Sequence, residues 1–155
     1  MKVKTIMVAD PACCAPGDAL AAAARVMWDR DCGVVPVVDR VSDHLVGVIT
    51  DRDICMAALS TGRTLHNVTV REIMTPDPAC CGPDDNLREV HGLMRDRQVR
   101  RIPVVDDEGG LVGLVSLSDL AIEAFGGRGP AATKRQRDAG RTLSAICERP
   151  LSETL

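Results

Sequence analysis

The chain has 155 residues, of which 45% are hydrophobic and 26% charged, and its formal net charge is −3. This length suffices for one ordinary domain or for two small units that share a core. One Trp, one Phe and no Tyr are too few rings for a platform that stacks single-stranded bases, and a negative net charge argues against a surface that tracks phosphates. We therefore expect neither a nucleic-acid-binding protein nor a large multidomain one.

The chain offers no signal for export or for membrane insertion. Its N-terminal stretch lacks the continuous apolar run of a secretory signal, and no later run approaches the roughly 20 apolar residues of a membrane helix. We expect a cytoplasmic protein without a membrane partner. The seven cysteines, an odd number, then indicate thiols rather than a disulfide framework.

The sequence of the first extended segment occurs twice in the chain. "ADPACCAPGDAL" at residues 9–20 returns nearly unchanged as "PDPACCGPDDNL" at residues 76–87. The later motifs return in the same order: "VVPVVD" (34–39) as "RIPVVD" (101–106), and "LVGVITDRDI" (45–54) as "LVGLVSLSDL" (111–120). The chain therefore consists of two copies of one unit.

Each copy predicts the same succession of elements. A short extended segment ends in a turn that offers Asp18, or Asp85 in the second copy, as the N-cap of a helix. Apolar residues then recur at helical spacing from Leu20 and from Leu87. Two runs rich in β-branched residues follow and predict hairpins, which pair 34–38 with 46–50 and 102–105 with 111–115.

A second helix is expected near Thr50 and near Ser116, so the unit is β-α-β-β-α. One such unit buries too little surface to be stable alone, whereas two packed together are credible. We expect an α+β fold of two tandem β-α-β-β-α repeats with a C-terminal helix. The expected limits are 1–62 for the first repeat, 63–69 for a connector, 70–125 for the second repeat and 126–155 for a basic tail.

The tail segment "AATKRQRDAGRTLSAIC" predicts a short basic amphipathic helix. Leu143, Ile146 and Cys147 would lie on one side of it, and Pro150 would end it. Such a helix could dock on its own module, on a second subunit or on a partner. A frayed terminus is the alternative.

The repeats resemble the CBS domain pair, or Bateman module. The resemblance covers about Val3 to Ala124, and the stretches that carry it are "CGVVPVVD" and "GVITDRDI" in the first copy and "VRRIPVVD" and "GLVSLSDL" in the second. It implies a pseudo-twofold module of two CBS repeats with two clefts between them. Such clefts commonly bind adenosine-containing ligands, namely AMP, ADP, ATP or S-adenosylmethionine.

The family's signature of a Gly, two apolar residues, Thr or Ser, two free positions and Asp occurs in both copies. The resemblance implies that ribose hydroxyls are held by Thr50 and Asp53 and by Ser116 and Asp119. The chemistry is suitable, because a carboxylate can accept two hydrogen bonds from a vicinal diol. The same spacing also forms a helix capping box, and a cap does not exclude a ligand.

By the same resemblance, the adenine would lie against the second strand of each copy. The residues implied are Val35, Pro36, Ile102 and Pro103, with 10–12 and 77–79 mapped less directly. Plain core packing is the alternative for the apolar strand residues, because alternate positions face opposite ways.

The two copies differ in basic residues at the positions where a bound phosphate would be contacted. Arg100 and Arg101 stand where the gamma subunit of AMP-activated kinase carries phosphate-contacting residues, whereas the first copy has Gly33 and Val34. Arg52 is a further candidate. A solvated turn is the alternative for the paired arginines.

The doubled cysteines fall in the short extended segment of each copy, where neighbours point to opposite faces. We expect one residue of Cys13-Cys14 and one of Cys80-Cys81 to face the core. Adjacent Cα atoms lie too close for an unstrained disulfide, and a zinc site needs convergent ligands. Further apolar runs predict core positions for Cys32 and Cys55.

The three histidines, His44, His66 and His91, have no partner at ligand spacing, so surface or core roles are expected rather than metal binding. No nucleophile, base and orienting acid occur together, so we expect no catalytic residues.

The function expected is that of a non-catalytic regulatory sensor. It would bind an adenosyl ligand without a required cofactor, form a homodimer, and act on an unidentified protein target. Two alternatives remain: a thiol-based or metal-based stress sensor on the same fold, and a structural interaction module with empty clefts.

Overall fold

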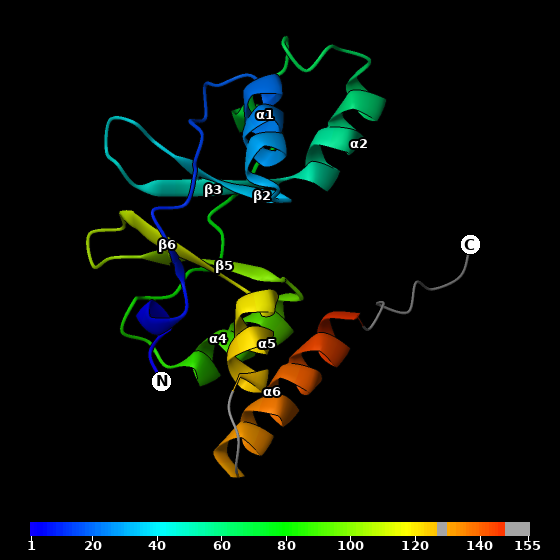
Figure 1. Ribbon diagram of the computed structural model, residues 1–155. Coiled ribbons are helices and arrows are strands. Elements are labelled where there is room, and N and C mark those ends of the chain that lie inside the picture. The colour runs from blue at the N-terminus through cyan, green and yellow to red at the C-terminus, as the bar shows by residue number, and fades with distance from the viewer. Residues whose placement is uncertain (127–129, 148–155) are drawn as a thin grey trace. The chain divides into compact units, whose positions relative to one another are not determined.

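The computed structural model describes residues 1–126 and 130–147, and both halves of the chain contain the same elements in the same order. The first half contains α1 (Leu20–Arg30), β2 (Val34–Val38), β3 (Leu45–Thr50) and α2 (Asp51–Thr61). The second half contains α4 (Leu87–Arg97), β5 (Arg101–Val105), β6 (Leu111–Ser116) and α5 (Leu117–Phe125). The short leading elements are η1 (Val3–Thr5) and β1 (Val8–Ala9), then α3 (Val70–Ile73) and β4 (Thr75–Pro76), and α6 (Pro130–Cys147) comes last. The expected α+β fold of two tandem repeats with a C-terminal helix is confirmed (Figure 1).

The first long helix of each copy is not capped as expected. The N-cap of α1 is Ala19, one residue after Asp18, and the N-cap of α4 is Asn86, one residue after Asp85. Asp18 instead closes the preceding turn, because its carboxylate accepts a hydrogen bond from the backbone N–H of Ala15 at 2.8 Å. The prediction of aspartate caps was therefore wrong: the turn uses both the side chain and the backbone of this residue before the helix begins.

Each copy's leading segment completes the sheet of the other copy. β4 lies near the start of the second repeat, yet it pairs antiparallel with β3 of the first, with Gly47 opposite Pro76. β1 lies near the start of the first repeat, yet it pairs with β6 of the second, with Ala9 opposite Gly113. The two three-stranded sheets, β2-β3-β4 and β1-β6-β5, are therefore related by an exchange of their edge strands.

The glycine that opens the signature in each copy has a structural role. A Cβ atom added at Gly47 would lie 3.0 Å from the carbonyl oxygen of Thr75, and one added at Gly113 would lie 3.3 Å from that of Val8. Each Cβ would also meet the side chain of the preceding methionine on the leading segment. The absence of a side chain thus lets the exchanged strand approach closely.

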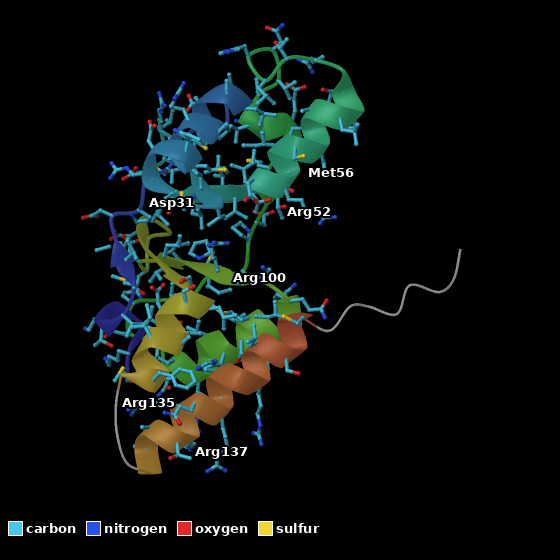
Figure 2. The ribbon with its side chains drawn as sticks, turned by 45° about the vertical axis from the view of Figure 1, so that its right-hand side comes forward. Asp31, Arg52, Met56, Arg100, Arg135 and Arg137 are labelled. Carbon is cyan, nitrogen blue, oxygen red and sulfur yellow. The ribbon has the colours of Figure 1, made fainter. Side chains whose placement is uncertain are left out.

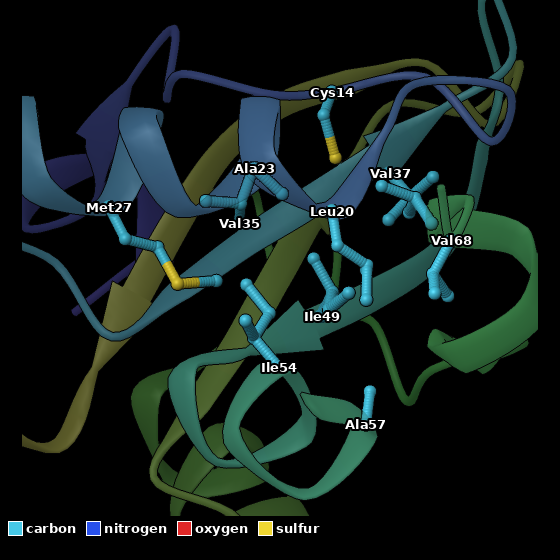
Figure 3. Close-up of a cluster of buried hydrophobic side chains, with 11 residues drawn as sticks. Cys14, Leu20, Ala23, Met27, Val35, Val37, Ile49, Ile54, Ala57 and Val68 are labelled. Carbon is cyan, nitrogen blue, oxygen red and sulfur yellow. The ribbon is translucent and has the colours of Figure 1, made fainter. Parts of the chain in front are cut away.

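The described chain divides into two compact units. One comprises residues 1–9, 79–104 and the described residues from Gly113 onward, and the other comprises residues 10–78 and 105–112. Figure 3 shows the core of the second of these, which is built from aliphatic side chains and one thiol. Its fully buried members include Leu20, Ala23, Val35, Val37 and Ile49. Within the ranges described, no helix combines the length and the apolar character needed to cross a membrane.

The C-terminal helix α6 packs along α4 and α5 of its own chain (Figure 1). Its buried face consists of Ala132, Ala139 and Thr142. Leu143, Ile146 and Cys147, expected on one side of the helix, do not form this buried face, because the Leu143 side chain is 51% exposed and Cys147 is exposed, with only Ile146 half-buried. Small side chains let the helix axis come close to α4 and α5, which larger ones would prevent. The expected stop at Pro150 lies outside the described residues.

Candidate functional site

The first signature motif forms the N-terminus of α2. The Thr50 hydroxyl accepts a hydrogen bond from the backbone N–H of Asp53 at 3.1 Å, and the Thr50 backbone N–H donates to Oδ2 of Asp53 at 2.9 Å. The hydroxyl also donates to the same Oδ2 at 2.7 Å. Because both donors bind Oδ2, the other carboxylate oxygen, Oδ1, has no hydrogen-bond partner among the described residues. The cap therefore uses one half of the Asp53 carboxylate.

The second signature motif repeats this geometry at the start of α5. The backbone N–H of Ser116 donates to Oδ2 of Asp119 at 2.7 Å, and its hydroxyl donates to the same oxygen at 2.6 Å. The Asp119 N–H in turn donates to the Ser116 hydroxyl at 3.2 Å. Asp53 and Asp119 are both half-buried. Each repeat thus carries a fixed carboxylate with one acceptor oxygen left over.

A third capping box, at the start of α3, differs from these two in that both oxygens of its carboxylate accept hydrogen bonds. At the start of α3, Oε1 of Glu72 accepts from both the N–H and the hydroxyl of Thr69, at 2.8 and 3.0 Å. Its other oxygen, Oε2, accepts from Nη1 of Arg63 at 2.7 Å. The Thr69 N–H and the Arg63 guanidinium together lower the pKa of Glu72 to about 2. Both oxygens of this carboxylate are occupied, unlike those of Asp53 and Asp119.

The strand residues expected near an adenine ring divide between two faces. The side chains of Val35 and Ile102 are fully buried, and Val35 belongs to the hydrophobic core. Pro36 and Pro103 follow directly and so lie on the opposite faces of β2 and β5, where they are buried as well. The Pro36 carbonyl accepts a hydrogen bond from the backbone N–H of Cys14 at 3.0 Å, and the Pro103 carbonyl accepts one from that of Cys81 at 3.1 Å.

Gly33, just before β2, and Arg100, just before β5, each lie beside the signature motif of their own repeat. The carbonyl of Arg100 accepts from the N–H of Leu117, the first residue of α5, at 2.8 Å. In the first copy the carbonyl of Gly33 accepts from the N–H of Asp51, the first residue of α2, at 3.3 Å. The arginine of the second copy is thus held at the helix N-terminus beside Ser116, whereas the first copy has a glycine and an added carboxylate there.

The basic candidates are all accessible. Arg52, Arg100 and Arg101 are exposed, and Figure 2 labels Arg52 at the start of α2 and Arg100 just before β5. A further hollow of about 190 Å³ lies in the unit of the first motif. Its lining comprises Asp10, Pro11, Cys13, Val38, Asp43 and Leu111. Asp10 and Pro11, which the resemblance placed near an adenine, therefore line a hollow whose lining does not include Thr50 or Asp53.

The doubled cysteines divide as expected, with one of each pair in the interior. Cys14 and Cys81 are buried, whereas Cys13 is exposed and Cys80 half-buried. Burial raises the pKa of the Cys14 and Cys81 thiols to about 12. The prediction of a core position for Cys55 was wrong, because it lies on the outer side of α2, next to buried Ile54.

The histidines do not converge. His44 and His66 are exposed, whereas His91 is buried between α4 and α6, where its Nδ1 lies 2.8 Å from the hydroxyl of Thr142. Across the described ranges, no group of three or more His, Cys, Asp or Glu side chains could hold a metal ion. No sequence pattern predicts the contact between His91 and Thr142, because the two residues are far apart in the chain and belong to no common motif.

Comparison with known proteins identifies the family. The chain belongs to the CBS domain family, whose sequence profile matches residues 3–60 and 70–125. CBS domain pairs are in general regulatory modules rather than catalysts. Over 120 residues the chain is 35% identical to the CBS domain-containing protein YhcV of Bacillus subtilis (strain 168), a match that covers 77% of this chain and 83% of that protein.

Two solved structures share both the fold and part of the sequence. The CBS domain pair of protein MJ0100, in complex with 5′-methylthioadenosine and S-adenosyl-L-methionine, is 29% identical with a TM-score of 0.69, covering 81% of this chain and 96% of that one. Hypoxic Response Protein I with two coordinated zinc ions is 31% identical with a TM-score of 0.71, covering 78% and 97%.

Proposed function

We propose that this protein is a non-catalytic sensor that binds an adenosyl ligand at its two signature motifs. In this proposal Oδ1 of Asp53 and Oδ1 of Asp119 accept hydrogen bonds from ribose hydroxyls, while Oδ2 of each continues to cap its helix. The hydroxyls of Thr50 and Ser116 position the carboxylates. The observation that carries the proposal is the unused acceptor oxygen on each fixed, half-buried carboxylate.

The remaining contacts follow from the placement of the strands. Pro36 and Pro103 would lie against the adenine, supported from beneath by the buried Val35 and Ile102. Arg100 and Arg101 would meet a phosphate at the second motif, because Arg100 is held beside the N-terminus of α5, where backbone N–H groups also favour an anion. Arg52 is the only one of the three basic candidates in the first repeat.

The signal would be transmitted through assembly. We propose a cytoplasmic homodimer in which the ligand binds two arrangements of the helices with different affinities, which shifts the population between them. A regulated protein target would recognise one of these arrangements. No separate cofactor enters this proposal, because the adenosyl compound is itself the signal.

The test is a thermal-shift series with AMP, ADP, ATP, S-adenosylmethionine and NADH on the wild type and on the double variant Asp53→Asn with Asp119→Asn. Asparagine keeps a carbonyl oxygen for the cap but presents an NH₂ group where the diol needs an acceptor. A ligand at 100 times its dissociation constant should stabilise the wild type by about 2.7 kcal/mol, or several degrees. The double variant should lose that shift.

The matched control is Glu72→Gln, which alters the capping box whose two oxygens are already occupied. It should lower the melting temperature slightly and leave the ligand-induced shift intact. A full shift in the double Asn variant would show that the carboxylates serve only as caps. The absence of a shift with every compound would favour the structural interaction module.

A further inference from the structure

The C-terminal helix α6 is held by both long helices of the second repeat. Nε of Arg135 forms an ion pair with Oε1 of Glu123 on α5 at 3.0 Å. Two turns further along α6, the Thr142 hydroxyl lies 2.8 Å from Nδ1 of His91 on α4. Because one helix makes directional contacts with two others, it can adopt this seat only when α4 and α5 stand in one relative placement.

Few apolar contacts hold α6 in this seat. Its buried face consists of Ala132, Ala139 and Thr142, and none of the large apolar side chains described on α6 is buried. Apolar packing tolerates small displacements, whereas a hydrogen bond weakens steeply as its angle departs from linearity. The seat is therefore sensitive to small shifts between α4 and α5.

The residues that hold α6 lie close in the chain to the residues proposed to contact a ligand. Glu123 stands one turn after Asp119, so both lie on the same side of α5. At the end of α4, Nε2 of Gln98 donates to the carbonyl of Ala145 in α6 at 3.5 Å. Gln98 is two residues before Arg100. The proposed ligand contacts Asp119 and Arg100 are thus each followed or preceded by a contact with α6.

The same two segments also meet at the second motif itself. The carbonyl of Arg100 accepts a hydrogen bond from the N–H of Leu117 at 2.8 Å, which joins the chain after α4 to the start of α5. These contacts form a closed ring, because α6 joins the same two segments a second time, away from the motif. A ligand bound by Asp119 and Arg100 would fix one side of this ring, and α6 fixes the other.

The first repeat lacks the groups that would hold such a helix. In the repeat alignment Ala24 stands for His91, Asp31 for Gln98 and Ala57 for Glu123. An alanine side chain forms no polar contact, and an ionised aspartate cannot donate a hydrogen bond to a carbonyl as a glutamine does. The ring of contacts is therefore specific to the second repeat.

We propose that α6 and the second signature motif are coupled, so that docking of α6 on α4 and α5 and binding of a ligand by Asp119 and Arg100 favour each other. This inference rests on the proposed function and names the element that would report occupancy of the second motif. Because coupling is reciprocal, a ligand raises the docking equilibrium of α6 by the factor by which docking raises the ligand's affinity. A released α6 would lose much of its helix, since tertiary packing supplies most helical stability in proteins.

The first experiment tests the coupling without a ligand. Ala139→Arg with Thr142→Arg places two long charged side chains in the buried face of α6 and should release the helix. The matched control, Ala131→Arg with Ser144→Arg, adds the same charge at exposed positions of α6 and should leave it docked. Amide hydrogen exchange, followed residue by residue by NMR, measures both effects.

Release of α6 should accelerate exchange roughly tenfold at the amide of Leu117, which bonds the carbonyl of Arg100. The amide of Asp51, which bonds the carbonyl of Gly33 at the equivalent place in the first repeat, should exchange as in the wild type. An unchanged Leu117 amide beside a released α6, or equal acceleration of both amides, would overturn the proposal. Full protection of residues 131–147 in the double Arg variant would overturn it as well, because α6 would then not occupy the seat that the coupling requires.

The second experiment adds ATP as the probe, in an Asp53→Asn background that removes the first motif from the titration. ATP should slow amide exchange over residues 131–147, and Asp119→Asn should abolish this effect. Titration calorimetry should show roughly tenfold weaker ATP binding by the double Arg variant than by its matched control, which carries the same added charge.

Failure of the coupling and failure of the proposed function give different results. Equal ATP affinity of the double Arg variant and its matched control would overturn the coupling and leave ligand binding at the second motif intact. An absence of ATP binding in the matched control would count against the proposed function at this motif. The exchange rate of the Leu117 amide would still decide whether docking of α6 is coupled to the motif.

Discussion

At the residue scale, each of the two motif carboxylates stabilises a helix start and still has one oxygen that can accept a hydrogen bond. Asp53 and Asp119 each hold a helix start through one oxygen and keep the other oxygen unused. In the Thr69–Glu72 capping box, by contrast, both carboxylate oxygens accept hydrogen bonds from the chain itself. Because the cap already fixes the carboxylate, the side chain would lose little further entropy in the proposed binding of a diol.

The cysteines give a residue-scale prediction that separates the nucleotide sensor from a thiol sensor. The pKa of Cys14 and Cys81 is raised to about 12 by burial, so neither forms the reactive thiolate near neutral pH. In the native protein we expect rapid reaction with a chromogenic disulfide reagent only at the exposed thiols of Cys13, Cys55 and Cys147. Mass mapping of the modified peptides checks this. Fast labelling of Cys14 or Cys81 would contradict the buried positions.

At the element scale, α6 is attached by small side chains, by the buried pair of His91 and Thr142, and by an ion pair between Arg135 and Glu123 of α5 at 3.0 Å. The Thr142 hydroxyl donates to the Asp138 carbonyl at 2.9 Å and so accepts from His91, which fixes the proton of the neutral imidazole on Nδ1. Burial lowers the pKa of His91 from its ordinary value of 6.5, opposed by the charge of Asp138 and assisted by that of Arg95. The docked helix therefore favours neutral His91.

This pKa shift predicts how stability changes with pH. Because the pKa of His91 is lower in the folded state, the unfolded chain binds more protons between that value and 6.5, and the unfolding free energy rises with pH across this window. The contribution is present above pH 6.5 and is lost as the pH falls through the folded-state pKa. His91→Ala, the residue found at the equivalent position of the first repeat, should cost about 1–2 kcal/mol at neutral pH. That difference from wild type should shrink in urea titrations at about pH 5; a constant difference would contradict the assignment.

At the scale of the whole molecule, the two repeats share a backbone plan and differ in charge. The second motif has Arg100 beside its helix start, whereas the first has Gly33 and Asp51 at the equivalent positions. A Cβ atom added at Gly33 would lie 3.0 Å from the Asp51 carboxylate. One protein thus offers a basic and an acidic version of the same local site.

This asymmetry predicts which ligand each repeat prefers. Arg100→Gln with Arg101→Gln should weaken binding of ATP roughly tenfold or more, through the loss of charge-assisted bonds to phosphate, and should leave adenosine affinity nearly unchanged. Titration calorimetry with both ligands measures the two effects. Arg97→Gln removes an exposed charge from the end of α4 and is the control for net charge. Equal losses for adenosine and ATP would indicate that the arginines support the fold rather than a phosphate.

Much of the fold was determined by the sequence alone, because the patterns that specify it are local. Runs of β-branched residues and helical spacing predicted the strands and helices, and the duplicated motifs showed that one unit is used twice. The starts of α2 and α5 at Thr50 and Ser116 were predictable because a capping box is written within four consecutive residues. The burial of one cysteine in each pair followed from the same local geometry.

Only the tertiary structure decided what depends on distant partners. The sequence pattern placed Leu143, Ile146 and Cys147 on one side of α6, but the close approach of α4 and α5 selected Ala139 and Thr142 for the buried face. No local sequence pattern predicts the exchange of β1 and β4 between the sheets, because the pairing of an edge strand depends on which strand lies next to it in the folded protein. The unused oxygens of Asp53 and Asp119 likewise depend on which groups lie within hydrogen-bonding distance in the folded chain, and that is set by packing between distant residues rather than by spacing along the sequence.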